Sequence, residues 1–159
     1  MESSSSRLLS LEKAAYVFHE RSRMKALSYG EITDGGLSVF QSVARLDDDN
    51  RLVLTFEGAI RIDNPYRYLS SYLDELARVL PQHPITSTVM DFVKMRFCNS
   101  NGFYVIMDIV DAVYNLVPGR VTVRRILDDD WQHETLPILL NLNEEHVAAR
   151  TTFEDVKET

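Results

Sequence analysis

The residues best placed to do chemistry in this chain form one polar turn, made of Asn99, Ser100, Asn101 and Gly102. An apolar, strand-like segment precedes it, and apolar residues follow at positions 103, 106, 107, 110, 113, 114 and 117. That spacing is typical of one face of an α-helix. The Ser100 hydroxyl is therefore predicted at a helix start, among backbone N–H groups that lack partners within the helix. A hydroxyl in this position can cap the helix, help to bind an anion or accept a phosphoryl group.

The motifs of several enzyme classes are missing from the sequence. It has no glycine-rich dinucleotide turn, no phosphate loop ending in Gly-Lys-Ser or Gly-Lys-Thr, and no Gly-x-Ser-x-Gly elbow. The histidines have no spacing that resembles a zinc site; they are His19, His83, His133 and His146. The carboxylates of Asp91, Asp108 and Asp111 lie along one strand-to-helix unit, but nothing in their spacing shows that they converge. We expect a protein without catalytic activity, metal or cofactor.

Two further candidates for chemistry have simpler explanations. The three aspartates at 47–49 offer oxygen ligands for a hard cation, but they lack the ligand spacing of a calcium loop. They are predicted to form a solvated turn. Cys98 flanks Ser100, and a helix N-terminus can make a thiol reactive. Because Cys98 follows Phe97 at the end of a predicted strand, we expect it to be a small, buried hydrophobic residue.

Size and charge narrow the class of protein. The 159 residues favour one domain, and 45% hydrophobic with 26% charged residues is typical of a globular chain. The net charge of −7 argues against nucleic acid and anionic lipid as partners. No apolar run approaches the ~20 residues that span a bilayer, and the N-terminus lacks the apolar stretch of a secretory signal. Since a single cysteine excludes an internal disulfide, the sequence predicts a cytoplasmic protein.

Residues 1–30 differ in charge from the rest of the chain. They hold five basic and three acidic residues; subtracted from the totals of 17 and 24, these leave 12 basic and 21 acidic residues in 31–159. Ser6 could cap a helix that runs to about Ala26. Its apolar stripe would consist of Leu8, Leu11, Ala15 and Phe18. We predict an N-terminal helical extension over 1–30, which either packs on the domain 31–159 or binds a partner or a second subunit.

The first half of the domain 31–159 shows strand signals and then helix signals. Residues 36–46 and 51–60 are rich in β-branched and aromatic residues, and the turn at 47–50 joins them into a predicted β-hairpin. Asp63 or Asn64 is expected to cap a helix with Pro65 at its first position, and Pro81 ends it. The buried stripe of this helix would be Leu69, Tyr72, Leu73, Leu76 and Leu80. Residues 85–93 indicate an interior strand.

The second half continues the alternation and sets the fold class. The helix over 103–117 is stopped by Pro118 and Gly119, and residues 120–127 alternate as a strand. A leucine-rich helix follows the acids at 128–130, and Pro137 means that it is kinked or begins near Thr135. Residues 146–153 indicate a final edge strand. This order predicts an α/β fold, with a mixed β-sheet and helices packed against it, joined by right-handed crossovers.

Residues 89–117 resemble the core of STAS domains, the fold of bacterial anti-sigma-factor antagonists. The shared pattern is a strand with Asp91 and Phe97, then Ser100 and Gly102, then a helix. Residues 56–60 resemble the second strand of the family, which ends in a glycine before the first helix. The pair Trp131-Gln132, followed by a leucine-rich helix, resembles a bacterial subgroup of STAS-like regulators that has a Trp-Gln pair there. The resemblance covers about residues 36–153.

This resemblance implies a STAS-like domain over 31–159 and a non-catalytic signalling protein that switches partners. In the family, the unphosphorylated domain binds a regulator, often a serine kinase that is also an anti-sigma factor. That kinase phosphorylates a serine at the turn, and a PP2C-type phosphatase restores it. The match makes Ser100 the phosphoacceptor and places Asn99, Asn101 and Gly102 in the partner-binding turn. A phosphate would add a charge of about −2 to this surface and disrupt contacts with a complementary partner.

The turn departs from the family pattern at two positions. Asn99 replaces the aspartate that commonly precedes the acceptor, and Asn101 replaces a serine or threonine. Asparagine can still cap the helix, but a negative charge beside the hydroxyl is lost, which affects recognition by a kinase. We expect Lys94 and Arg96 near the turn, either as groups that favour an added phosphate or as solvated charges at a strand end.

Two other functions are compatible with the sequence. One is a STAS-like scaffold that is not phosphorylated and forms homo-oligomers through residues 1–30. The other is a module that binds an anion or a nucleotide at the helix start formed by residues 100–102.

Overall fold

Six strands form one mixed β-sheet in the structure, a computed structural model that describes residues 24–158. The strands are β1 (Lys25–Asp34), β2 (Leu37–Leu46), β3 (Arg51–Ile60), β4 (Ser87–Cys98), β5 (Val121–Ile126) and β6 (Thr151–Val156). They lie side by side in chain order. The pairs β1–β2 and β2–β3 are antiparallel, and the other neighbouring pairs are parallel.

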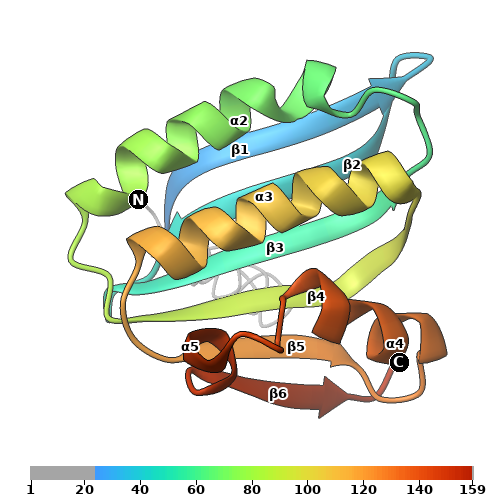
Figure 1. Ribbon diagram of the computed structural model, residues 1–159. Helices are drawn as coiled ribbons and strands as arrows, with labels where there is room; N and C mark the ends of the chain where they lie inside the picture. Colours follow the sequence, from blue (N-terminus) through green and yellow to red (C-terminus); the bar gives the residue numbers. More distant parts are fainter. Residues whose placement is uncertain (1–23, 159) are drawn as a thin grey trace, which may run out of the picture.

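The helices of the described residues pack against one side of this sheet (Figure 1). They are α2 (Tyr66–Val79), α3 (Ser100–Leu116), α4 (Asp130–Leu139) and α5 (Glu145–Ala148), with a short 3-10 helix at Leu80–Gln82. α2 lies over β1, and α3 lies between α2 and α4. The predicted α/β fold, with helices packed against a mixed sheet, is therefore confirmed. None of the helices within residues 24–158 is long and apolar enough to cross a membrane.

The β2–β3 hairpin and its acidic turn agree with the prediction. The carboxylate of Asp47 accepts hydrogen bonds from the backbone N–H groups of Asp49 and Arg51, both at 2.9 Å. Asn50 completes the turn with a φ of 61°, a left-handed conformation that asparagine tolerates better than most residues. Because local backbone groups use the Asp47 carboxylate, the acidic triplet is a turn and not a ligand set.

The predicted extension over 1–30 is wrong at its C-terminal end. Residues 1–23 lie outside the described residues, but Lys25 begins β1, so residues 25–30 belong to the sheet. β1 lacks an apolar alternation because its core-facing residues include Ser28 and Gly30. The Ser28 hydroxyl donates to Glu75 at 2.6 Å, and a Cβ on Gly30 would lie within 2.9 Å of three Tyr72 side-chain atoms. An aromatic side chain from α2 thus fills the space that β1 leaves.

Two helix starts also differ from the prediction. α2 begins at Tyr66, and neither Asp63 nor Asn64 caps it: Pro65 occupies the N-cap position without a side-chain bond. α4 begins at Asp130, because the carboxylate of Asp129 caps it by accepting from Gln132 N at 3.0 Å. Pro137 lies inside the last turns of α4, so a start near residue 135 is excluded.

The last strand is shorter and later than the prediction at 146–153. Residues 145–148 form α5, and β6 covers 151–156 at the edge of the sheet, parallel to β5. β4, in contrast, is longer than predicted and runs to Cys98. It therefore delivers the chain directly to the turn that holds Ser100.

Candidate functional site

Asn99, and not Ser100, caps α3. Its backbone is extended, and its side-chain oxygen accepts a hydrogen bond from Gly102 N at 2.8 Å. The amide of Asn99 thus satisfies one of the N–H groups that a helix start leaves without a partner. The sequence left open whether Ser100 is a cap, and this geometry assigns the cap to its neighbour.

Ser100 is the first residue of α3, and its side chain is exposed. Within residues 24–158 its hydroxyl makes no hydrogen bond, and neither do the backbone N–H groups of Ser100 and Asn101. A helix N-terminus carries a partial positive charge. The Ser100 hydroxyl therefore lies in a position that is accessible and electrostatically favourable for an added anionic group.

Both asparagines attach the turn to the loop between β3 and α2. The Asn99 side chain donates to the Ile62 carbonyl at 3.0 Å, and its backbone N–H donates to the Ile60 carbonyl at 2.9 Å. The Asn101 side chain donates to the Asp63 carbonyl at 2.6 Å. A carboxylate has no N–H to donate. An aspartate at position 99 could therefore not make the bond to Ile62, and the Asn101 amide supplies the donor for Asp63.

Gly102 lets α3 approach the ends of β3 and β4. A Cβ at this position would lie 2.8 Å from side-chain atoms of Ile60 and 3.0 Å from the Cβ of Cys98. Such contacts are too short for any side chain, so the glycine keeps the helix start close to the sheet.

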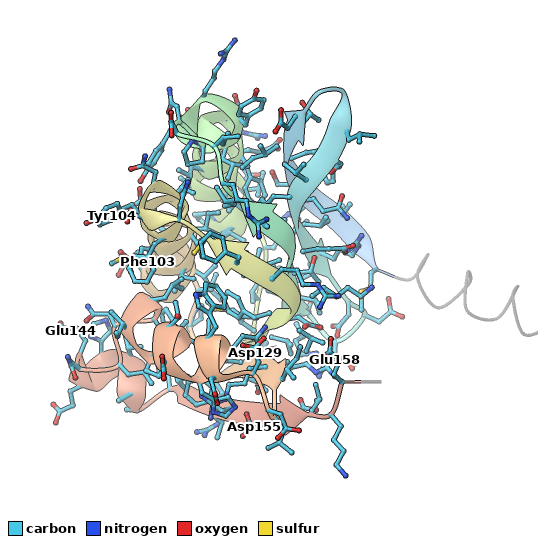
Figure 2. All side chains as sticks on the ribbon, turned by 90° about the vertical axis from the view of Figure 1, so that its right-hand side faces the viewer. Phe103, Tyr104, Asp129, Glu144, Asp155 and Glu158 are labelled. Carbon is cyan, nitrogen blue, oxygen red and sulfur yellow. The ribbon has the colours of Figure 1, made fainter. Side chains whose placement is uncertain are left out.

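An open groove of about 420 Å³ lies beside Ser100, between the start of α3 and α4. It is lined by Cys98, Asn99, Ser100, Phe103, Tyr104, Trp131, Glu134, Thr135 and Ile138. Tyr104 and Ile138 are 57% and 67% exposed, so two large side chains with apolar surface face solvent at this groove. Figure 2 views the molecule from this end and shows Phe103 and Tyr104 on α3, with α4 starting beyond Asp129. Glu134 is the charged residue among those that line it, so the groove is partly apolar and weakly acidic.

The Trp131-Gln132 pair fixes the far wall of this groove. Trp131 packs against Phe97, with ring centroids 6.1 Å apart. The buried Gln132 side chain accepts from Ile126 N at 2.7 Å and donates to the carbonyls of Phe92 and Met95 at 2.8 and 3.1 Å. Gln132 thereby joins α4 to β4 and β5, and every polar atom of its amide has a partner.

Lys94 and Arg96, which we expect near the turn, are exposed residues of β4. Neither residue lines the groove, and Arg96 instead forms an ion pair with Glu158 at 3.2 Å. Arg61 does not line the groove either, and its guanidinium lies 5.1 Å from the centre of the Phe97 ring. Arg61 follows Ile60, the residue whose carbonyl binds Asn99 N, so its place depends on a tertiary contact that local sequence does not show.

The remaining candidates for chemistry have structural partners. Burial raises the pKa of the Cys98 thiol to about 11, which keeps it protonated and a weak nucleophile at neutral pH. Asp91 pairs with Arg124 at 2.8 Å, and Asp108 accepts from the Tyr66 hydroxyl at 2.6 Å. Among residues 24–158, no group of three or more histidine, cysteine, aspartate or glutamate side chains could hold a metal ion.

Comparison with known proteins adds no family name to this geometry. No protein-family model matches the chain, and a search of curated proteins finds no similar sequence.

Proposed function

We propose that this is a non-catalytic, cytoplasmic signalling protein that exchanges binding partners when Ser100 is phosphorylated. The observation that carries the proposal is that Asn99, and not Ser100, caps α3. The exposed Ser100 hydroxyl has no hydrogen bond within the described residues. A hydroxyl without a structural task beside an apolar groove supports a regulatory role. The resemblance of residues 89–117 to STAS domains supports the same reading.

The groove beside Ser100 is the surface on which a partner would bind in the unphosphorylated state. Its exposed apolar side chains, Tyr104 and Ile138, would be covered by the partner and so add binding energy. A phosphate on Ser100 would place a charge of about −2 in the same lining as Glu134. A partner that covers the groove would then have to remove water from this charge, which weakens binding. The partner would then be released.

The start of α3 would tolerate the phosphate without unfolding. The N–H groups of Ser100 and Asn101 and the partial positive charge of the helix end would stabilise it. By the STAS resemblance, the partners are a serine kinase that also acts as an anti-sigma factor and a PP2C-type phosphatase. The phosphorylated and unphosphorylated domains would then share one fold and differ in the surface that they present.

Phosphorylation is tested by incubating the full chain with ATP and a serine kinase of the anti-sigma-factor class, followed by mass-spectrometric mapping. We expect one phosphate on Ser100, none in Ser100→Ala, and normal labelling in Ser71→Ala, a control for an exposed serine on α2. Phosphate on another residue would refute the assignment of the acceptor.

Partner exchange is tested by measuring the affinity of the same kinase for the variants. We expect Ser100→Asp to bind more than about tenfold more weakly, a loss of about 1.4 kcal/mol, while Ser100→Ala binds as the wild type does. Equal binding by both variants would contradict a phosphorylation switch and would leave the scaffold without phosphorylation as the better account.

A further inference from the structure

The side of the sheet opposite to α2, α3 and α4 carries no helix from residues 24–158 (Figures 1 and 2). Strands β3 to β6 are parallel. Parallel sheets in globular proteins are usually covered on both faces, because the crossover helices and their neighbours bury them. The uncovered face of this sheet is therefore a candidate binding surface.

An apolar patch crosses this face from β1 to β4. The register pairs Tyr29 with Val43 and pairs Val53 with Val89, while Val43 and Val53 are diagonal neighbours on β2 and β3. None of these four residues belongs to the core cluster on the helix side; Val53 and Val89 are half-buried, and Val43 is already buried, with 6% exposure. Tyr29, Val43, Val53 and Val89 are called the valine patch below. Tyr29 is 51% exposed.

Polar rows bound the valine patch. On the side of β4 to β6, Asp91, Arg124 and Glu154 lie side by side and form two ion pairs, at 2.8 and 3.5 Å. On β1 to β3, Glu31, Gln41 and Glu57 lie in one row beside the patch. The second row continues to Lys94 on β4, and Arg45 lies beside Val53, so the surroundings of the patch carry both signs of charge.

The N-terminal segment 1–23 has the properties that this face requires. It enters the sheet directly at β1, the strand that carries Tyr29. Its sequence predicts a helix with an apolar stripe at 8, 11, 15 and 18, and its charged residues include Arg21 and Arg23 close to β1. A helix over residues 6–23 would be about 27 Å long, whereas four neighbouring strands span about 14 Å. The segment is therefore long enough to cover the valine patch.

We propose that residues 1–23 dock on the valine patch of their own chain, so that the stripe containing Ala15 and Phe18 covers Val53 and Val89. The N-terminal segment thus completes the second layer of the domain, and the groove at Ser100, on the opposite side of the sheet, stays open for a partner.

The docking is tested in the full chain by disulfide trapping. In a Cys98→Ala background, Ala15→Cys is combined with Thr55→Cys, which lies on the uncovered face beside Val43. The control combines Ala15→Cys with Asp74→Cys, an exposed position on α2 on the other side of the sheet. We expect the first pair to form an intramolecular disulfide at least about tenfold faster than the control, since docking holds the two thiols at a millimolar effective concentration.

A second measurement does not depend on the geometry of a disulfide. Labelling of Thr55→Cys by a maleimide should become faster when Phe18→Asp removes an apolar contact, and Lys13→Asp should have no such effect. Equal trapping at residues 55 and 74, or no trapping together with labelling that Phe18→Asp leaves unchanged, would overturn the proposal. Disulfides found only between two molecules would also overturn it, because the segment would then cover the face of a second copy.

Discussion

At the scale of single residues, Asn99 makes three interactions that the local sequence does not distinguish. It caps α3 through Gly102 N, donates to the Ile62 carbonyl and binds the Ile60 carbonyl through its backbone. The first task could be done equally well by aspartate or serine. The second needs an N–H donor, which asparagine supplies and aspartate does not.

Replacing Asn99 should therefore destabilise the domain more than replacing Asn101. We expect Asn99→Ala to lower the free energy of unfolding by about 1–2 kcal/mol, because the cap and a half-buried hydrogen bond are both lost. Asn101→Ala should cost less than about 1 kcal/mol, since its single bond to Asp63 is exposed. Urea unfolding followed by circular dichroism measures both.

Asn99→Asp separates the two side-chain roles of Asn99. A carboxylate keeps the cap and gains from the helix dipole, but it cannot donate to the Ile62 carbonyl and would repel that oxygen. We expect its stability to fall between those of the wild type and Asn99→Ala. A variant as stable as the wild type would show that the bond to Ile62 contributes little.

At the scale of elements, both ends of α3 are held by side chains from outside the helix interior. Asn99 closes the N-terminal end, and the Arg150 guanidinium donates to the carbonyls of Tyr114, Val117 and Gly119 at the C-terminal end. A cation is favourable at a helix C-terminus. Because the groove beside Ser100 is formed by the first turn of α3, clamping both ends keeps this wall of the groove in place.

The other wall of the groove depends on Gln132. Removing its amide would leave Ile126 N and the carbonyls of Phe92 and Met95 buried without these partners. We expect Gln132→Ala to lower the free energy of unfolding by about 3 kcal/mol or more. The control is Gln82→Ala, an exposed glutamine in the 3-10 helix, which should change it by less than about 0.5 kcal/mol. Equal, small effects in both variants would show that the Gln132 bonds are not needed to hold α4.

Sequence could predict the elements whose own residues alternate between apolar and polar with the period of a strand or a helix. The β2–β3 hairpin, the strand before the turn and α3 all show a period that matches their burial. β1 was missed because its core side is built from Ser28 and Gly30, and the apolar group that fills the space is Tyr72 of α2. The start of α4 was uncertain because Pro137 suggested a break, whereas the cap at Asp129 decides it.

At the scale of the whole molecule, the candidate site is a product of topology. Sequence could predict that Ser100 stands at a helix start, because turn and helix are contiguous. It could not predict the groove, since Tyr104 on α3 and Ile138 on α4 approach each other only through the order of the strands. The residues that line the groove therefore do not include Lys94 and Arg96, the two exposed cations that flank the buried Met95 on β4.

The one cysteine, Cys98, lines the groove and is buried, so its ionisation makes the stability of the whole molecule depend on pH in the alkaline range. Burial raises the pKa of the Cys98 thiol from 9.0 to about 11. A raised pKa means that the folded state holds the thiol proton more tightly than the unfolded state does. The contribution of the protonated thiol to the free energy of unfolding is therefore complete below pH 9 and is lost as the pH rises through 11. At pH 10 the wild type should have lost about 1 kcal/mol of this contribution relative to pH 8.

The variant Cys98→Ala isolates this effect from the tyrosines that titrate in the same range. Its free energy of unfolding should be lower than that of the wild type at pH 8, because a buried side chain is shortened. Between pH 8 and pH 10, however, it should fall by about 1 kcal/mol less than the wild type, since no thiol remains to ionise on unfolding. Urea unfolding at both pH values measures this double difference. Parallel losses in the two proteins would mean that the Cys98 thiol is accessible to solvent, and the groove wall next to Ser100 would then be open in solution.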